Sequence, residues 1–190
     1  MSTDAVLAER IEAYVRAKDG NRPHRLIDVF AETALLEMVV NSDAIAFPAL
    51  TQDCDAIADV LVSRFGQQYE NVYTFCLSDP PSPGAVRFEC AWLVVMTEKI
   101  TGSVRAGCGL YEWSLAPPLA QWVGRLRILI DRMDVLPKEV AERSFRWIEG
   151  LPYPWCPLAA LASAPSSPPE LRFVIERAGI LAARRGSPAS

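Results

Sequence analysis

The stretch that decides the fold is residues 86–97, which reads VRFECAWLVVMT. It is rich in Val, Phe and Trp, which favour β strands, and it contains neither Gly nor Pro. Three further stretches with many β-branched and aromatic residues are found at residues 72–77, 105–115 and 122–133. The segments between them are short and contain turn residues, and loops this short join neighbouring antiparallel strands. The four stretches therefore predict an antiparallel meander.

The residues before this meander predict helices and one more strand. Apolar residues recur at helical spacing over residues 4–18 and 23–31. They do so again over residues 53–65, where Gly66 is expected to end the helix. Residues 34–40 are typical of a strand. Helices that precede a single sheet pack on one of its faces, so the predicted fold class is α+β, with a curved antiparallel sheet and N-terminal helices on one face.

Side-chain alternation along the strands predicts two different faces of the sheet. One face is wholly apolar and must lie under the helices; in residues 86–97 it consists of Phe88, Cys90, Trp92, Val94 and Met96. The opposite face mixes apolar residues with charges, and we place on it Arg87, Glu89, Arg105, Arg125, Arg127, Leu129, Asp131 and Met133. Such a mixed face needs a cover. We expect a sheet-to-sheet homodimer, with the C-terminal helices folding back over the sheet as the alternative.

The last part of the chain differs from the rest. Residues 137–151 have a helical pattern, whereas residues 152–169 hold six of the fifteen prolines, a density that blocks regular structure. A final helix is expected over residues 169–183. We therefore divide the chain into an α+β domain, residues 1–136, and a helical, Pro-rich C-terminal extension, residues 137–190.

Charge and hydropathy argue against two classes of partner. The chain has 190 residues and a net charge of -4 at pH 7, whereas nucleic-acid-binding proteins usually present a basic face. No uncharged apolar run reaches the length of about 18 residues that a membrane helix needs. No basic segment of the kind that opens a secretory signal precedes the first helix. We expect neither a nucleic-acid nor a membrane partner.

The cysteines predict a reducing environment. They are odd in number and show no C-x-x-C spacing: Cys54, Cys76, Cys90, Cys108 and Cys156. His24 is the only histidine, so the sequence offers no cluster of Cys and His ligands. We expect buried free thiols, a cytoplasmic location, no metal and no cofactor.

Three segments carry a family resemblance. Residues 11–19 read IEAYVRAKD, residues 26–34 read LIDVFAETA, and residues 130–137 read IDRMDVLP, at the end of a strand that begins with Trp122. In these segments and in the order of its elements, the chain resembles the nuclear transport factor 2-like (NTF2-like) superfamily over residues 4–136. This superfamily includes SnoaL-like polyketide cyclases, ketosteroid isomerase and scytalone dehydratase. The resemblance implies a cone of helices and curved sheet, whose open end holds a pocket for an apolar small molecule.

The same resemblance suggests site residues. Tyr14 lies where ketosteroid isomerase has an oxyanion-donating Tyr, and Glu37 stands beside Met38, which takes the place of its general base. Asp131 lies near an aspartate of the related limonene epoxide hydrolase. Tyr14, Glu37 and Asp131 are therefore the candidate catalytic residues. Four residues expected at the pocket or its mouth are the candidate ligand contacts: Asp43, Trp92, Tyr111 and Trp113.

Each candidate also has a plain structural interpretation. Tyr14 and the other aromatic residues are also suited to core packing. Glu37 can be an outward surface charge, Asp43 a turn cap, and Asp131 one half of a salt bridge with Arg127 or Arg105. The second oxyanion donor of ketosteroid isomerase would fall near residues 109–110, where the sequence has no carboxylate.

Three functions remain open at this point. The first is an enzyme, such as an isomerase, dehydratase or cyclase, that acts by acid/base chemistry on a cyclic or polyketide-like molecule. The second is a binding module with the same pocket and no chemistry. The third is a non-catalytic dimeric interaction protein whose pocket is filled by its own side chains, with Trp147, Tyr153 and Trp155 as the candidates.

Overall fold

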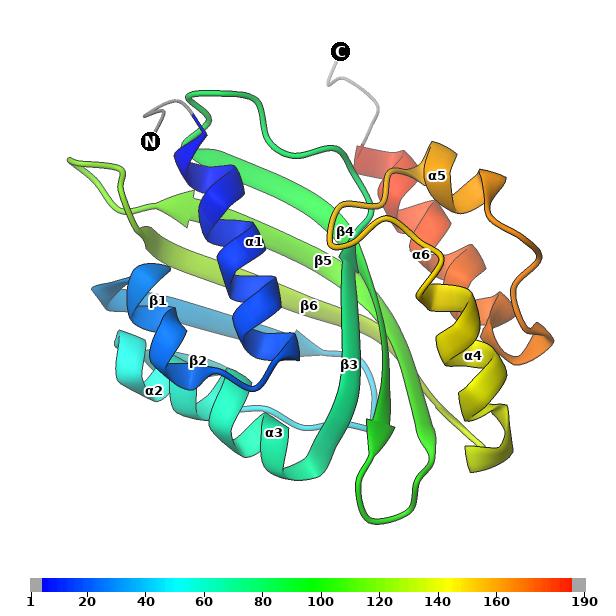
Figure 1. Ribbon diagram of the computed structural model, residues 1–190. Helices are drawn as coiled ribbons and strands as arrows, with labels where there is room; N and C mark the ends of the chain where they lie inside the picture. The colour runs from blue at the N-terminus through cyan, green and yellow to red at the C-terminus, as the bar shows by residue number, and fades with distance from the viewer. Residues whose placement is uncertain (1–4, 186–190) are drawn as a thin grey trace.

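The computed structural model describes residues 5–185 and shows one curved six-stranded sheet in the order β2-β1-β6-β5-β4-β3 (Figure 1). The predicted meander and the α+β fold class are confirmed. The strands of the meander are β3 (Tyr69–Cys76), β4 (Arg87–Glu98), β5 (Val104–Leu115) and β6 (Val123–Leu136), and each pairs antiparallel with the next. Residues 1–4 of the predicted α+β domain and residues 186–190 of the predicted C-terminal extension lie outside the described residues.

The first strand gives the sheet a mixed edge. β1 (Phe30–Val40) begins earlier than predicted and pairs with β6 in parallel. A short strand that the sequence did not predict, β2 (Leu50–Gln52), pairs antiparallel with β1 and forms the edge of the sheet. The meander pattern gave no information about which strand β1 would join, because that partner lies far along the chain.

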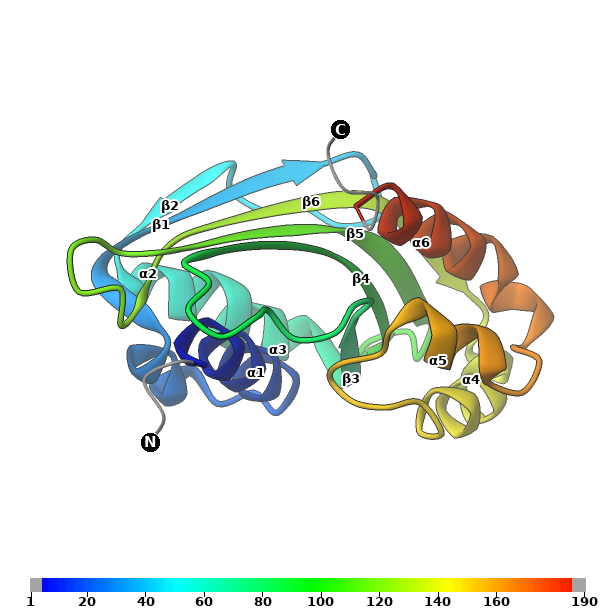
Figure 2. The same ribbon diagram turned by 90° about the horizontal axis from the view of Figure 1, so that it is seen from above.

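The N-terminal helices lie in the concavity of the sheet (Figure 2). They are α1 (Val6–Asp19), the 3₁₀ helix η1 (Pro23–Asp28), and a continuous helical stretch of α2 (Cys54–Ala58), the π-helical η2 (Asp59–Ser63) and α3 (Arg64–Gln68). The Asp53 carboxylate caps this stretch by accepting a hydrogen bond from the backbone N–H of Ala56 at 2.8 Å. The expected end at Gly66 is wrong, since the helix continues to Gln68.

The two faces of the sheet follow the predicted alternation, except near a β-bulge. The pairs Cys108–Arg132 and Gly109–Ile130 leave Asp131 as an extra residue in β6. Beyond this bulge the alternation is reversed, so Met133 belongs to the inner core rather than to the outer face. The predicted position of Arg105 on the outer face is also wrong. Arg105 donates to the Ala44 carbonyl on the inner side, because it shares a face with Tyr111 on β5.

The C-terminal extension covers much of the outer face. Its elements are η3 (Lys138–Val140), α4 (Ala141–Ile148), α5 (Leu158–Ser163), η4 (Pro169–Leu171) and α6 (Arg172–Arg185). A second apolar core joins outer-face residues of β4 and β5, such as Leu93 and Leu110, to Val174 and Ala178 of α6. The C-terminal helices, which were the alternative to a second copy of the chain, therefore cover the outer face over these strands (Figure 2). A second copy could contact only the part of the outer face that the helices leave uncovered.

A proline-rich strap, residues 149–157 between α4 and α5, pairs with the last residue of the edge strand β3. The backbone N–H of Cys76 donates to the Pro154 carbonyl, and that of Cys156 donates to the Cys76 carbonyl, both at 2.8 Å. These bonds satisfy backbone groups that an open edge strand would expose. The strap therefore attaches the extension to the sheet by the main chain as well as by side chains.

Candidate functional site

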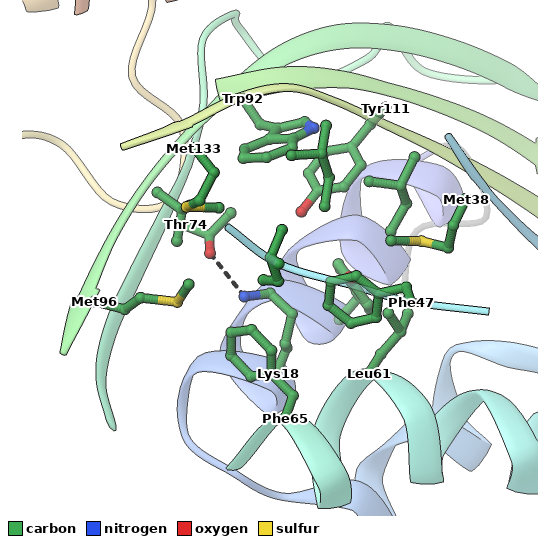
Figure 3. A pocket seen from close by; sticks show the side chains of 15 residues that line it. Lys18, Met38, Phe47, Leu61, Phe65, Thr74, Trp92, Met96, Tyr111 and Met133 are labelled. Atoms are coloured by element: carbon green, nitrogen blue, oxygen red, sulfur yellow. Dashed lines mark hydrogen bonds between the residues drawn. The ribbon is translucent and has the colours of Figure 1, made fainter. Parts of the chain in front are cut away.

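A cavity of about 50 Å³ lies between α1, the concave face of the sheet and the loop before β2 (Figure 3). Most of its lining side chains are apolar: Tyr14, Lys18, Met38, Ile45, Phe47, Leu61, Phe65, Thr74, Trp92, Val94, Met96, Tyr111, Ile128, Ile130 and Met133. Ligand pockets usually measure ~300–1,000 Å³. In this conformation the cavity therefore has room for no more than a few water molecules or a very small compound.

Two glycines on the inner face of β5 make room for the side chains that form the cavity wall. A Cβ atom on Gly109 would lie 1.7 Å from the Leu129 carbonyl oxygen and 2.7 Å from the Trp92 ring. A Cβ atom on Gly107 would lie 2.5 Å from the Met133 methyl carbon. Gly109 therefore leaves no room for a side chain, whereas a side chain at position 107 would require the end of Met133 to move.

One end of the cavity is polar and is built around a buried ion pair. The Lys18 ammonium donates to Asp19 Oδ1 at 2.8 Å. It also donates to Thr74 Oγ1 at 2.9 Å, the bond drawn in Figure 3. The side chains of Lys18 and Asp19 are only 8% and 5% exposed. Asp19 also accepts from the Thr74 N–H at 2.7 Å, the Thr74 hydroxyl at 2.9 Å and the Tyr153 hydroxyl at 2.9 Å. Hydrogen bonds therefore largely saturate this carboxylate.

The wall next to this end is aromatic. Tyr14 packs edge-on against Trp113 at a centroid distance of 5.1 Å, and Trp92 lies 5.6 Å from Tyr111. The Tyr14 and Tyr111 rings meet edge to face at a centroid distance of 6.1 Å, and burial raises the pKa of both phenols well above the ordinary value. The indole N–H of Trp92 has no hydrogen-bond partner among the described residues. Both tyrosines therefore stay neutral at physiological pH.

Solved structures share this architecture, although no protein-family model and no curated protein sequence matches the chain. An NTF2-like protein from Burkholderia thailandensis superposes with a TM-score of 0.51 at 11% identity, covering 68% of this chain and 91% of that protein. The fold is that of the NTF2-like superfamily. An LEH-like epoxide hydrolase from Mycobacterium tuberculosis also matches, with a TM-score of 0.51, 8% identity and coverage of 67% and 84%. A computationally designed 17-OHP binder has a TM-score of 0.51, 13% identity and coverage of 69% and 97%.

Three of the predicted site residues line the cavity of this NTF2-like fold: Tyr14, Trp92 and Tyr111. Trp113 is buried behind Tyr14 and is not part of the lining. Asp43 is exposed in the loop that leads to Ile45. The predicted aromatic residues thus lie together, whereas the predicted carboxylates lie elsewhere.

Glu37 and Asp131 lie on the outer face of the NTF2-like sheet. Arg125 donates to both carboxylate oxygens of Glu37, at 3.0 and 2.7 Å, and these bonds lower the Glu37 pKa. Arg177 of α6 binds Asp131 in the same way, at 2.6 and 2.9 Å, and lowers its pKa. The expected partners of Asp131, Arg127 and Arg105, are wrong, because α6 covers this part of the sheet. Neither carboxylate faces a molecule held in the cavity.

Lys18, the main polar residue of the cavity, was not among the predicted site residues. The helical spacing indicates that Lys18 is buried, since it lies on the same face of α1 as Leu7, Ile11 and Tyr14. A lysine on the buried face of an amphipathic helix needs a partner, and Asp19 follows it directly.

No group of three or more His, Cys, Asp or Glu side chains within residues 5–185 could hold a metal ion. In the same part of the chain, no helix has the length and apolar character to cross a membrane.

Proposed function

We propose that this protein binds a small apolar molecule in the cavity without changing it chemically. The observation that carries the proposal is the lining, in which aliphatic, aromatic and methionine side chains surround a single polar end at Lys18. Methionine side chains adapt to ligands of different shape, and three of them line this cavity. The designed 17-OHP binder, which shares the fold, supports a binding role for such a cavity.

Acid/base catalysis has less support from the site. A general base must reach the proton it removes, at about 2.6–3.2 Å. Of the described residues that line the cavity, none carries a carboxylate, and the neighbouring Asp19 already accepts four hydrogen bonds. Tyr14 and Tyr111 have raised pKa values and are poor bases as neutral phenols. Binding is therefore favoured over isomerase, dehydratase or cyclase activity.

The cavity must widen to accept a ligand, and the loop before β2 is the place where it can do so. A second hollow of about 140 Å³ lies between this loop and the helical stretch of η2 and α3, and it shares Ile45, Phe47 and Phe65 with the cavity. Phe47 stacks on Phe65 at a centroid distance of 6.5 Å and separates the two spaces. A rotation of Phe47 would join them. Trp147, Tyr153 and Trp155, the side chains expected to fill the pocket in a non-catalytic interaction protein, are not part of the cavity lining.

Thermal unfolding with apolar probes tests the proposal. Methylenecyclohexane and cyclohexanone at a hundredfold excess over Kd should raise the Tm by about 5–10 °C. Val94→Phe fills the cavity from β4 and should abolish the shift. Val86→Phe makes the same change at an exposed position just before β4 and should retain it. An equal shift in both variants, or none in the native protein, would remove the basis for a cavity ligand.

A homodimer through the uncovered part of the outer face is a second proposal. Val39 on β1 and Leu50 on β2 are 37% and 56% exposed, beside the Glu37–Arg125 pair. Apolar residues among paired charges suit a second copy of the same surface. Sedimentation at micromolar concentration should give twice the mass of the chain, and Val39→Asp should return it to a monomer. A native protein that sediments as a monomer would mean that the C-terminal extension is the only cover.

We also propose that the protein is located in the cytoplasm. All five cysteines fall within the described residues and are buried free thiols. Such thiols suit a reducing compartment. Cell fractionation of the native protein, followed by thiol labelling under denaturing conditions, should recover it in the cytosol with five reactive thiols.

A further inference from the structure

The polar end of the cavity offers more hydrogen-bond donors than its own acceptors use. The Lys18 ammonium has three N–H groups, of which two bind Asp19 and Thr74. The third has no oxygen partner among the described residues, although the Phe65 ring lies 5.0 Å from the nitrogen. In the aromatic wall next to this end, the buried Trp92 N–H is also unpartnered. A buried donor without a partner is costly, so this end is suited to an acceptor from outside the chain.

The cluster also determines which charge the acceptor can carry. The positive charge of Lys18 is already balanced by the carboxylate of Asp19, and both side chains are almost fully buried. An anionic ligand would give this enclosed cluster a net negative charge and would lose its own hydration. A neutral oxygen atom gains the hydrogen bond without that cost.

We propose that Lys18 recognises a neutral carbonyl oxygen on an otherwise apolar ligand, such as a ketone, lactone or ester. This inference rests on the proposed function, because it names the ligand class of the same cavity. The Lys18 nitrogen and the Tyr111 hydroxyl point toward the same space in Figure 3. A carbonyl group there would receive the third Lys18 N–H, and its apolar body would lie among the methionine and aromatic side chains.

Ordered water is the other possible acceptor, and it makes a different prediction. A water molecule needs only polar neighbours and a volume of about one probe sphere, which the cavity provides. Water would satisfy Lys18 in the free protein, and a ligand would have to replace it with an oxygen atom of its own. A ligand without oxygen would lose that bond, so the affinity difference between two matched ligands reports on Lys18.

Cyclohexanone and methylenecyclohexane form the matched pair, since they differ only in C=O against C=CH₂. The ratio of their Kd values should change by about tenfold or more, at the expense of the ketone, between the native protein and Lys18→Met. Comparing the ratio in two proteins cancels the different water solubility of the probes. Lys138→Met, an exposed lysine in the extension, should leave the ratio unchanged. Cyclohexanecarboxylate should bind more weakly than cyclohexanone.

Infrared spectroscopy of the native protein keeps the test independent of the variants, since Lys18→Met leaves Asp19 without its charge partner. The carbonyl stretch of bound ¹³C-labelled cyclohexanone should lie below its value in hexane, as expected for a hydrogen bond to an ammonium group. A hexane-like frequency would overturn the inference, as would a Kd ratio that Lys18→Met does not change or tighter binding of the carboxylate. If neither uncharged probe binds at all, the proposed function itself fails.

Discussion

The hydroxyl of Tyr153 in the C-terminal strap donates a hydrogen bond to Asp19 Oδ2 at the end of α1, at 2.9 Å. The two residues are separated by 134 positions in the sequence. Because Asp19 also holds Lys18, this bond connects the extension directly to the polar end of the cavity. The extension is therefore part of the environment of the candidate site.

Loss of this connection should weaken the protein measurably. Tyr153→Phe removes one of four hydrogen bonds to a buried carboxylate, which we expect to lower the free energy of unfolding by about 1.5–3 kcal/mol. Urea unfolding measures the change. Tyr73→Phe is the matched control, because the Tyr73 hydroxyl reaches an exposed carboxylate, Glu149, at 3.3 Å. Equal losses in the two variants would contradict the role given to Asp19.

The Asp131–Arg177 pair predicts a dependence of stability on pH. Arg177 lowers the Asp131 pKa in the folded protein, so the pair stabilises fully above the unfolded pKa of about 3.9. That stabilisation is lost as the pH falls through the lower folded pKa. Asp131→Asn should therefore lower the urea midpoint at pH 7, and the difference from the native protein should shrink as the pH falls below the unfolded pKa of about 3.9 and through the lower folded pKa. Asp43→Asn, at an exposed loop position, should leave the urea midpoint unchanged at both neutral and acidic pH. A lower midpoint for Asp131→Asn that persists in strong acid would contradict the stabilising role of the ionised Asp131.

The two glycines of β5 should differ in their tolerance of a methyl group. Gly109→Ala places a Cβ atom against a backbone carbonyl, which cannot move aside, and should cost at least about 3 kcal/mol or prevent folding. Gly107→Ala mainly meets the end of the flexible Met133 side chain and should cost about 1–2 kcal/mol. Soluble yield and urea midpoints provide the comparison. If Gly107→Ala cost more than Gly109→Ala, β5 would not pack this closely against the Leu129 carbonyl of β6.

Phe47 should control entry into the cavity. Phe47→Ala removes the ring between the cavity and the second hollow, so the association rate of cyclohexanone should rise by about tenfold or more. Because Phe47 is only partly buried, the cost in stability should be near the low end of the range for Phe→Ala, about 3 kcal/mol or less. Stopped-flow tryptophan fluorescence follows the association, since Trp92 lines the cavity. An unchanged rate would place the entrance elsewhere.

The fold could be predicted from the sequence where a local pattern determines the structure. The alternation in residues 86–97 identified the inner face of β4, because each residue type there reflects which side of the sheet it faces. The position of Met133 could not be predicted in this way. It depends on the bulge at Asp131, which arises from the pairing with Cys108 and Gly109 on another strand.

The candidate site shows the same limit. Tyr14, Trp92 and Tyr111 were found because aromatic residues on an apolar face are visible in the sequence. Glu37 was selected for its neighbour Met38, although alternation places the two on opposite faces. The bond between Asp19 and Tyr153 could not be predicted, because nothing in the local pattern relates the end of α1 to the strap.

Methionine-methyl NMR tests the central claim most directly, because Met38, Met96 and Met133 all line the cavity. With ¹³C-methyl methionine incorporated into the native protein, cyclohexanone is added in steps up to saturation. If the cavity binds the ketone, the three methyl resonances shift together along one binding curve, and Val94→Phe abolishes the shifts. Resonances that stay unchanged while cyclohexanone binds, or that shift equally in Val94→Phe, would contradict the claim that this cavity is a ligand site.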